Sequence, residues 1–238
     1  MKAALLLAAT LSKWVYTRDG SELPPDVEQL ANHNRYAIVK PKTIFGKEEI
    51  KEDGKTCVIV HRGTDSVDDL IHDSESQFEH RCTDDGFVKA FSDSLDEFKD
   101  DQTNDMEILK EDGTCQRFIM VGHSLGGATV AAWGPDPDVE HKITFGEPKT
   151  CCGSTKKDMK HWRVINGVLS GDHDPVPSLP KRENIFHCTG NVMQVLPGEN
   201  IKVDHMADRS DPKDVPLLDL NWHKITDYIK SIENSNTI

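Results

Sequence analysis

The sequence has no apolar run long enough to cross a lipid bilayer, which takes roughly 20 residues in a helix. Basic residues are also scarce: 28 Lys and Arg stand against 41 Asp and Glu, which leaves a formal net charge of −13. Nucleic acids and anionic membranes attract basic surfaces, so this charge argues against both as partners. We therefore expect no nucleic-acid partner and no stable membrane insertion, while a neutral or cationic partner stays open.

Cysteine motifs for metal binding or redox chemistry are missing as well. None of the six cysteines forms a Cys-x-x-Cys pair, so neither a zinc site nor a thioredoxin-like site is expected. Scattered reduced thiols are the favoured interpretation, and two or three disulfides in a secreted protein are the alternative. The chain also lacks an Asn-x-Ser/Thr glycosylation site. We expect a soluble protein, with the cytoplasm slightly favoured over secretion.

No internal repeat and no low-complexity linker divides the chain. Its 238 residues, 36% hydrophobic and 29% charged, predict one globular domain over residues 1–238. Residues 1–17 have two interpretations. A lysine followed by an apolar run resembles a short secretory signal with a weak cleavage site at residues 8–10. A first helix is favoured, because apolar residues continue through Trp14, Val15 and Tyr16.

Short β-branched and aromatic runs alternate with helical patterns along the chain. The runs predict buried strands at residues 56–60, 117–121, 142–145 and 162–166. Apolar residues at spacings of three and four predict helices at residues 86–101 and 222–232, and an alanine-rich helix begins at Gly126. Strands that alternate with helices indicate an α/β fold with a mostly parallel central sheet and helices on both faces.

The segment Gly122-His123-Ser124-Leu125-Gly126 fits the pattern Gly-x-Ser-x-Gly. It lies where the strand FIMV ends and the helix GGATVAAW begins, which is the context that a nucleophile elbow requires. The glycines allow a turn too tight for side chains, and the helix start offers free N–H groups to a developing oxyanion. We therefore predict that Ser124 is a catalytic nucleophile.

A serine nucleophile needs a base, and the base needs an acid that orients it. On this type of fold the acid follows the serine in the chain and the histidine comes last. Asp174 precedes a proline in the loop GDHDPVPSLP and is the predicted acid, whereas Asp172 is interpreted as a turn cap. The candidate bases are His187, His205 and His223, and the pattern alone gives His223 only a modest lead.

Several segments together resemble the class 3 lipase family, that of the filamentous-fungal triacylglycerol lipases. VGHSLGGA resembles the family's nucleophile elbow, RVINGVLSGDHDPVPSLP its acid-bearing segment, HKITDYI its terminal histidine segment and VIVHRGTDSVDDLIHD its oxyanion turn and lid. The resemblance implies an α/β-hydrolase fold and favours His223 over His205 as the base. It also implies an oxyanion hole formed by Thr64 and Leu125, and a lid at about residues 65–78.

Three departures from the family pattern stand out. His61 replaces the usual Phe before Arg-Gly-Ser/Thr, and Trp222 replaces the usual Asp before the base. The lid segment carries four aspartates and few apolar residues, although a lid that opens onto lipid needs a larger apolar patch. We therefore expect only transient contact with a lipid interface, and a preference for small or micellar esters over emulsified long-chain fat.

The predicted function is hydrolysis of lipid-like carboxylic esters, through a Ser-Asp-His triad and an acyl-enzyme. This chemistry needs no organic cofactor, and the eleven histidines show no metal-ligand spacing, so no metal is expected either. A phospholipase or acyltransferase is one alternative, because pocket shape sets the leaving group and the acceptor. A non-catalytic lipase-like binding module and an esterase of non-lipid substrates are the others.

Overall fold

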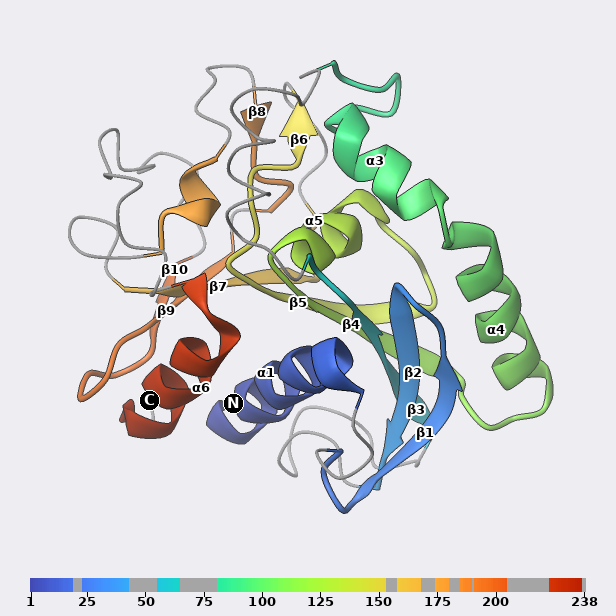
Figure 1. Ribbon diagram of the computed structural model, residues 1–238, viewed down its shortest axis with the longest axis horizontal. Helices are drawn as coiled ribbons and strands as arrows, with labels where there is room; N and C mark the ends of the chain where they lie inside the picture. The colour runs from blue at the N-terminus through green and yellow to red at the C-terminus, as the bar shows by residue number, and fades with distance from the viewer. Residues whose placement is uncertain are drawn as a thin grey trace.

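An eight-stranded sheet runs through the molecule (Figure 1). The computed structural model describes residues 1–18, 23–42, 55–64, 81–152, 158–167, 174–179, 185–189, 191–204 and 223–236. In spatial order the strands are β1 (Val27–Asn32), β2 (Tyr36–Pro41), β3 (Thr56–His61), β4 (Arg117–His123), β5 (Val139–Phe145), β7 (His161–Asn166), β9 (Val192–Val195) and β10 (Lys202–Asp204).

The middle of this sheet is parallel and its edges are antiparallel. Strands β3, β4, β5, β7 and β9 pair in parallel, whereas β1, β2 and β10 pair antiparallel with their neighbours. The four strands predicted as apolar runs are β3, β4, β5 and β7, and all four are confirmed. The sequence analysis did not predict the other four, of which the edge strand β1 has no fully buried residue.

Helices cover both faces of the sheet, as predicted. Helices α1 (Lys2–Thr17) and α6 (Ile225–Asn234) share one apolar core with alternate residues of the strands, such as Val58, Val60 and Val121. The intervening strand residues, such as Ile59 and Met120, share a second core with α4 (Lys99–Glu111) and α5 (Leu125–Ala132). Since side chains alternate across a strand, the two cores lie on opposite faces.

The first helix is confirmed and is part of the core. Leu5, Leu11, Trp14 and Val15 of α1 are buried, and they pack against the sheet and α6. The helix ends at Arg18, which has φ of 50° and donates its backbone N–H to the carbonyl of Trp14, a common helix stop. No helix in the described ranges has both the length and the apolar character needed to span a membrane.

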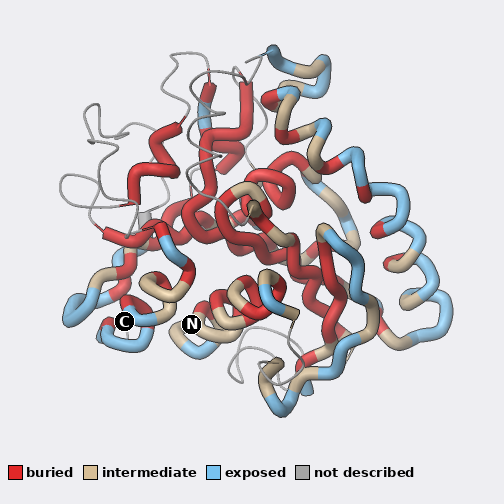
Figure 2. The backbone as a smooth tube through the Cα atoms, viewed as in Figure 1, coloured by how far each residue is buried: buried red, intermediate tan, exposed pale blue. Residues whose placement is uncertain are grey.

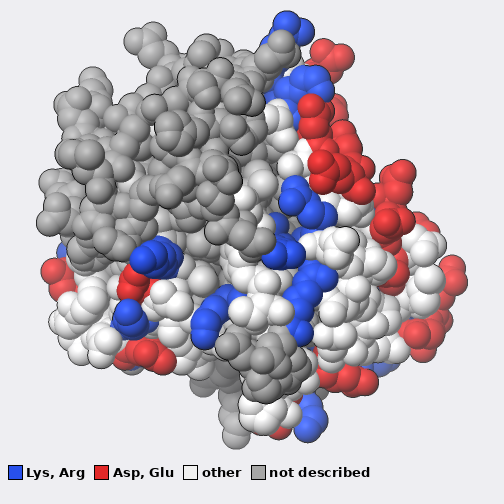
Figure 3. All heavy atoms as spheres, in the orientation of Figure 1, with Lys and Arg blue, Asp and Glu red and all other residues white. Residues whose placement is uncertain are grey.

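The segment predicted as one helix at residues 86–101 forms two. Helix α3 (Lys89–Asp96) and α4 are separated at Phe98, which has φ of −142° and a buried side chain. Apolar burial at Phe98 therefore outweighs continuation of the helix. Most acidic residues of both helices lie on the outer face, where Figure 3 shows a line of Asp and Glu, whereas Asp105 accepts from the Tyr36 hydroxyl of β2. Figure 2 shows the same exposed face on α4, beside a buried sheet and a buried α5.

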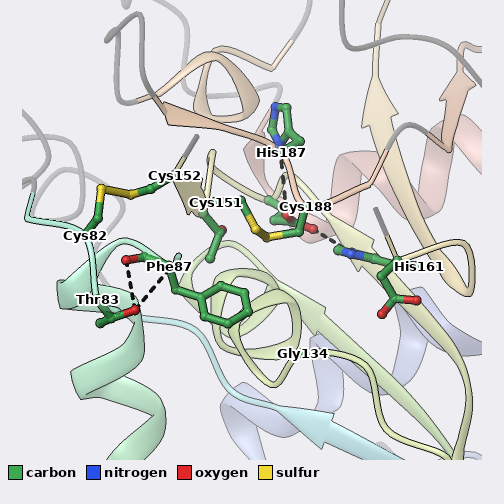
Figure 4. The surroundings of a disulfide bond; sticks show 12 residues. Cys82, Thr83, Phe87, Gly134, Cys151, Cys152, His161, His187 and Cys188 are labelled. Carbon is green, nitrogen blue, oxygen red and sulfur yellow. Dashed lines mark hydrogen bonds and ion pairs between the residues drawn. A yellow bond between two sulfur atoms is a disulfide. The ribbon is translucent and has the colours of Figure 1, made fainter. Parts of the chain in front are cut away.

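Three disulfides join all six cysteines, so the interpretation as reduced thiols is wrong. The pairs are Cys57–Cys115, Cys82–Cys152 and Cys151–Cys188. Adjacent Cys151 and Cys152 form strand β6, which pairs with β8 (Ile185–Phe186), and they bond to different partners (Figure 4). Successive side chains of a strand point in opposite directions, so the two neighbours reach cysteines on different sides.

The Cys57–Cys115 bond links β3 to the residues just before β4 across 58 positions of sequence. Replacing both cysteines by alanine is expected to lower the free energy of unfolding by about 2–4 kcal/mol, because the unfolded chain regains the freedom of a long loop. Urea unfolding of the oxidised proteins measures the difference. The wild type under reducing conditions is the control, and equal stability of the oxidised wild type and the double variant would contradict a bond that constrains the unfolded chain.

Candidate active site

The carboxyl ends of β3, β4, β5 and β7 bring the predicted site residues to one edge of the sheet. Ser124 follows β4 directly and has φ of 58° and ψ of −126°, a strained conformation for a residue with a side chain. The turn is tight, because a Cβ on Gly122 would lie 2.3 Å from the carbonyl oxygen of Gly126. The glycines of the motif therefore allow the strained serine, as the pattern predicts.

The turn after β3 lies directly against this elbow. A Cβ on Gly126 would lie 2.4 Å from the carbonyl oxygen of His61, and one on Gly63 would lie 2.6 Å from that of His123. The two backbones are thus in contact at two points. Thr64 follows Gly63, and Leu125 begins α5 immediately after Ser124. The two predicted oxyanion residues come from elements that touch.

Asp174 and His223 form a buried pair at the same edge. The backbone N–H of Asp174 donates to the carbonyl of Asn166 at the end of β7, at 2.9 Å. His223 Nδ1 lies 2.7 Å from Asp174 Oδ2, and both side chains are fully buried. Because a carboxylate only accepts, Nδ1 carries the proton and Nε2 is the basic nitrogen.

The Asp174 carboxylate accepts two further hydrogen bonds. Tyr228 donates its hydroxyl to Oδ2 at 2.5 Å, and the N–H of Val176 donates to Oδ1 at 2.9 Å. Burial alone raises the pKa of Asp174, but attraction to His223 and these hydrogen bonds hold it below its usual value. Asp174 is therefore a carboxylate, and it can stabilise a positive charge on His223.

Ser124 Oγ and His223 Nε2 are both buried, and neither has a hydrogen-bond partner within the part of the chain that the structure describes. Ser124 and His223 both lie against the end of β5. The N–H of Ser124 donates to the carbonyl of Phe145, and the next residue, Gly146, touches the His223 ring. The His223 ring also lies against the ring of His123, with centroids 4.6 Å apart and the two planes tilted by 31°.

The sequence analysis did not assign a role to His123. Its Nε2 donates to the backbone carbonyl of His223 at 2.6 Å, and its Nδ1 accepts from the Tyr16 hydroxyl at 3.0 Å. Burial, followed by repulsion from His223, lowers the pKa of His123 to about 3, so this ring is neutral at ordinary pH. The neutral His123 directly precedes Ser124, so its hydrogen bond holds the backbone of His223 close to the serine.

The contact of Tyr228 with Asp174 is the other one that the sequence did not reveal. Tyr228 lies in the segment 222–232, which was predicted as a helix from its apolar spacing, and it is fully buried on α6. A buried tyrosine needs a partner for its hydroxyl, and this requirement was the available signal. The partner could not be identified before the fold placed α6 beside Asp174.

The remaining candidates lie elsewhere. His187 is buried with Nε2 at 2.8 Å from the carbonyl of Pro177, so it anchors the acid-bearing segment. Asp172, His205 and the lid at about residues 65–78 lie outside the described residues. Among the described side chains, no group of three or more His, Cys, Asp or Glu is arranged to hold a metal ion. The absence of a metal stays a prediction.

Another buried histidine lies next to the oxyanion turn. His61, the last residue of β3, has Nδ1 at 2.9 Å from Thr129 Oγ1 of α5, and its ring packs edge-on against Phe98 and Trp133. Burial lowers the pKa of His61 to about 3. At the position where the resemblance implies a phenylalanine, the chain thus has a neutral, hydrogen-bonded ring in the apolar core.

Solved structures share this arrangement of elements. A Rhizomucor miehei lipase, in a propeptide complex, superposes with a TM-score of 0.69 at 19% identity, over 97% of this chain and 79% of that chain. A triacylglycerol lipase whose catalytic centre is a serine protease triad superposes with a TM-score of 0.67 at 19% identity, over 92% of this chain and 91% of that chain. A lipase from Rhizopus microsporus var. chinensis superposes with a TM-score of 0.67 at 17% identity, over 93% of this chain and 85% of that chain. At this identity the likeness establishes the fold, and no curated protein matches in sequence.

The parallel sheet, the strained serine at the end of β4 and the buried acid–histidine pair define an α/β-hydrolase. The model of the family "Lipase (class 3)" matches residues 58–184, more than half of the chain. The chain therefore belongs to the class 3 lipase family. It is a carboxylic ester hydrolase, of the lipase and esterase kind, as the sequence predicted.

Gly146 tests the packing of the acid–histidine pair. Its φ is +57°, and a Cβ there would lie 2.6 Å from Asp174 Oδ2 and 2.7 Å from His223 Cε1. Gly146→Ala is expected to displace the pair and lower kcat/KM for an ester by at least about 100-fold. The control is Gly113→Ala, at φ of +76° with open space around it, which should cost only about 1 kcal/mol of stability. Equal activity of the two variants would contradict the packing.

His61 predicts a specific pH dependence of stability. Its pKa is about 3 in the folded protein and about 6.5 when unfolded, so the unfolded chain binds one more proton between these values. Stability therefore falls as pH drops from 6.5 towards 3. Urea unfolding at pH 4 to 7 measures how the free energy of unfolding changes with pH. In His61→Phe this dependence on pH should be shallower by up to about 1.4 kcal/mol per pH unit. An equal pH dependence in the wild type and in His61→Phe would mean that His61 binds a proton in the folded protein as readily as in the unfolded chain.

Proposed function

We propose that Ser124, His223 and Asp174 are the catalytic triad of this ester hydrolase, and that Thr64 and Leu125 form its oxyanion hole. The observation that carries the proposal is the buried Asp174–His223 pair beside the strained Ser124. Ser124 Oγ and His223 Nε2 are both buried, and within the described residues neither is occupied by another hydrogen bond, which supports the exchange of a proton between them during the reaction.

In the first half of the reaction, Ser124 Oγ attacks the ester carbonyl carbon while its proton passes to His223 Nε2. The carbonyl oxygen gains the electron pair of the π bond and accepts hydrogen bonds from the backbone N–H groups of Thr64 and Leu125. When the tetrahedral intermediate collapses, the bond between carbon and the leaving alcohol oxygen breaks. His223 gives its proton to that oxygen, and an acyl-enzyme remains.

In the second half, water attacks the acyl-enzyme and transfers a proton to His223 Nε2. Collapse of the second intermediate breaks the bond to Ser124 Oγ, which regains the proton as the carboxylic acid leaves. Asp174 keeps its charge throughout, orients Nδ1–H and stabilises the imidazolium. The lowered pKa of Asp174 supports this role, because a protonated acid could not stabilise the charge.

The substrates proposed are lipid-like esters, with small or micellar esters preferred over emulsified fat. The aspartate-rich sequence of the lid segment supports this preference, and contact with a lipid interface would then be transient. A phospholipase or acyltransferase reaction uses the same residues and differs in leaving group or acceptor. We also propose an oxidising compartment, because three disulfides are typical of proteins outside the cytosol, against the slight preference for the cytoplasm in the sequence analysis.

The first test is hydrolysis of p-nitrophenyl esters from acetate to palmitate by the wild type, Ser124→Ala and Asp174→Asn. Ser124→Ala should lower kcat by several orders of magnitude, and Asp174→Asn by roughly 10⁴-fold, because its amide would favour the wrong histidine tautomer. Ser12→Ala is the matched control, since Ser12 is also fully buried but lies within α1. It should keep full activity.

Three results would change the assignment. A wild type that turns over while Ser124→Ala loses nothing would remove Ser124 as the nucleophile. If every protein is inert on every ester, the alternative of a binding module that retains the fold moves to the front. A sharp rise in activity above the solubility limit of a long-chain ester would contradict the preference for small or micellar substrates.

A further inference from the structure

We propose that His61 is a positioning residue that sets the distance between the two halves of the oxyanion hole. The inference rests on the roles proposed for Thr64 and Leu125. His61 contacts neither the substrate nor the reacting atoms in this proposal, and it acts through its hydrogen bond to α5.

The two oxyanion donors belong to different elements. Thr64 follows β3, whereas Leu125 begins α5, and a developing oxyanion must lie within about 2.7–3.1 Å of both N–H groups. A change in the spacing of β3 and α5 therefore moves one donor relative to the other. Misplacement by about 1 Å can lower a rate by about 100-fold.

Backbone contact limits how closely β3 and α5 approach. Gly126 leaves room for the carbonyl of His61, and any side chain there would clash. Such contact prevents closer approach but does not prevent separation. The hydrogen bond between the His61 ring and Thr129 adds a direct attraction between β3 and α5, one turn further along α5, to the pairing of β3 with β4.

Thr129 lies in the middle of a short hydrogen-bonded chain. Its hydroxyl has one proton and lies 3.0 Å from the carbonyl of Gly126, which can only accept. With Nδ1 of His61 protonated, the hydroxyl accepts from the ring at 2.9 Å and donates to Gly126. The result is a chain from the end of β3, through Thr129, to the residue that follows Leu125.

The surroundings of His61 hold its ring in one orientation. The ring is fully buried and edge-on to Phe98 and Trp133, with its centroid 5.2 Å from that of Phe98. A phenylalanine, the residue usual in the family, would fill this space but could not bond to Thr129. The bond is therefore a polar link between β3 and α5 within otherwise apolar packing.

Two substitutions of Thr129 distinguish a role in positioning the oxyanion hole from a role in packing. Thr129→Val keeps the side-chain shape and removes the hydroxyl, whereas Thr129→Ser keeps the hydroxyl and removes a buried methyl group. If the link positions the hole, Thr129→Val should lower kcat for a p-nitrophenyl ester about 10- to 100-fold with KM nearly unchanged. Thr129→Ser should retain most of kcat while losing thermal stability. A purely structural role predicts that activity follows Tm in both variants.

His61→Phe closes the test as a double-mutant cycle. It should lower kcat by a factor similar to that of Thr129→Val, and the double variant should be no worse than either single variant, because each removes the same hydrogen bond. The affinity for an alkyl boronic acid, which forms a tetrahedral adduct with the serine, should fall by the same factor as kcat/KM. Thr189→Val removes a buried hydrogen bond to the carbonyl of His161 elsewhere and should leave kcat unchanged.

The outcomes are distinguishable from failure of the proposed function. An inert wild type overturns the triad and oxyanion assignments themselves. An active wild type with full kcat in His61→Phe and Thr129→Val overturns the positioning role alone. Additive losses in the double variant, or an equal kcat loss in Thr189→Val, would also overturn it, because the losses would then come from general destabilisation.

Discussion

Contact between backbones at the carboxyl edge of the sheet is the constraint on which the site depends. At Gly63, Gly122 and Gly126 any Cβ would lie 2.6 Å or less from another group, so the turn after β3 and the turn after β4 meet without intervening side chains. This contact places the strained Ser124 beside the oxyanion turn. The loop that carries Asp174 and the start of α6 then complete the site from β7 and from the end of the chain.

Buried and half-buried polar groups around this edge form one connected set. Tyr16 bonds to His123, His123 to the backbone of His223, His223 to Asp174, and Asp174 to Tyr228. Helices α1 and α6, which pack on each other, supply the two tyrosines. The helices that cover one face of the sheet thus also orient the acid–histidine pair, and packing in that core is coupled to the geometry of the site.

The parts predictable from sequence were those with local causes. The parallel strands are continuous apolar runs because both of their faces are buried, and the elbow is recognisable because glycines must flank its serine. Tyr228 could be predicted as buried but not as a partner of Asp174, since that contact joins distant segments. The break at Phe98 and the disulfides depend on tertiary packing, which periodicity and spacing do not reveal. The roles of Ser124, Asp174, His223, Thr64 and Leu125 stay predictions.

The neighbouring cysteines of β6 have a consequence for oxidative folding. Exchange of partners between Cys151 and Cys152 would connect the same four cysteines, but each thiol would then have to point to the opposite face of its strand. That reversal is incompatible with the register in which Cys151 lies opposite Phe186 and Cys152 opposite Ile185. The pairing of β6 with β8 therefore discriminates between the two disulfide isomers, and the thiolate of an external thiol can attack a mispaired disulfide and reopen it until the strands align.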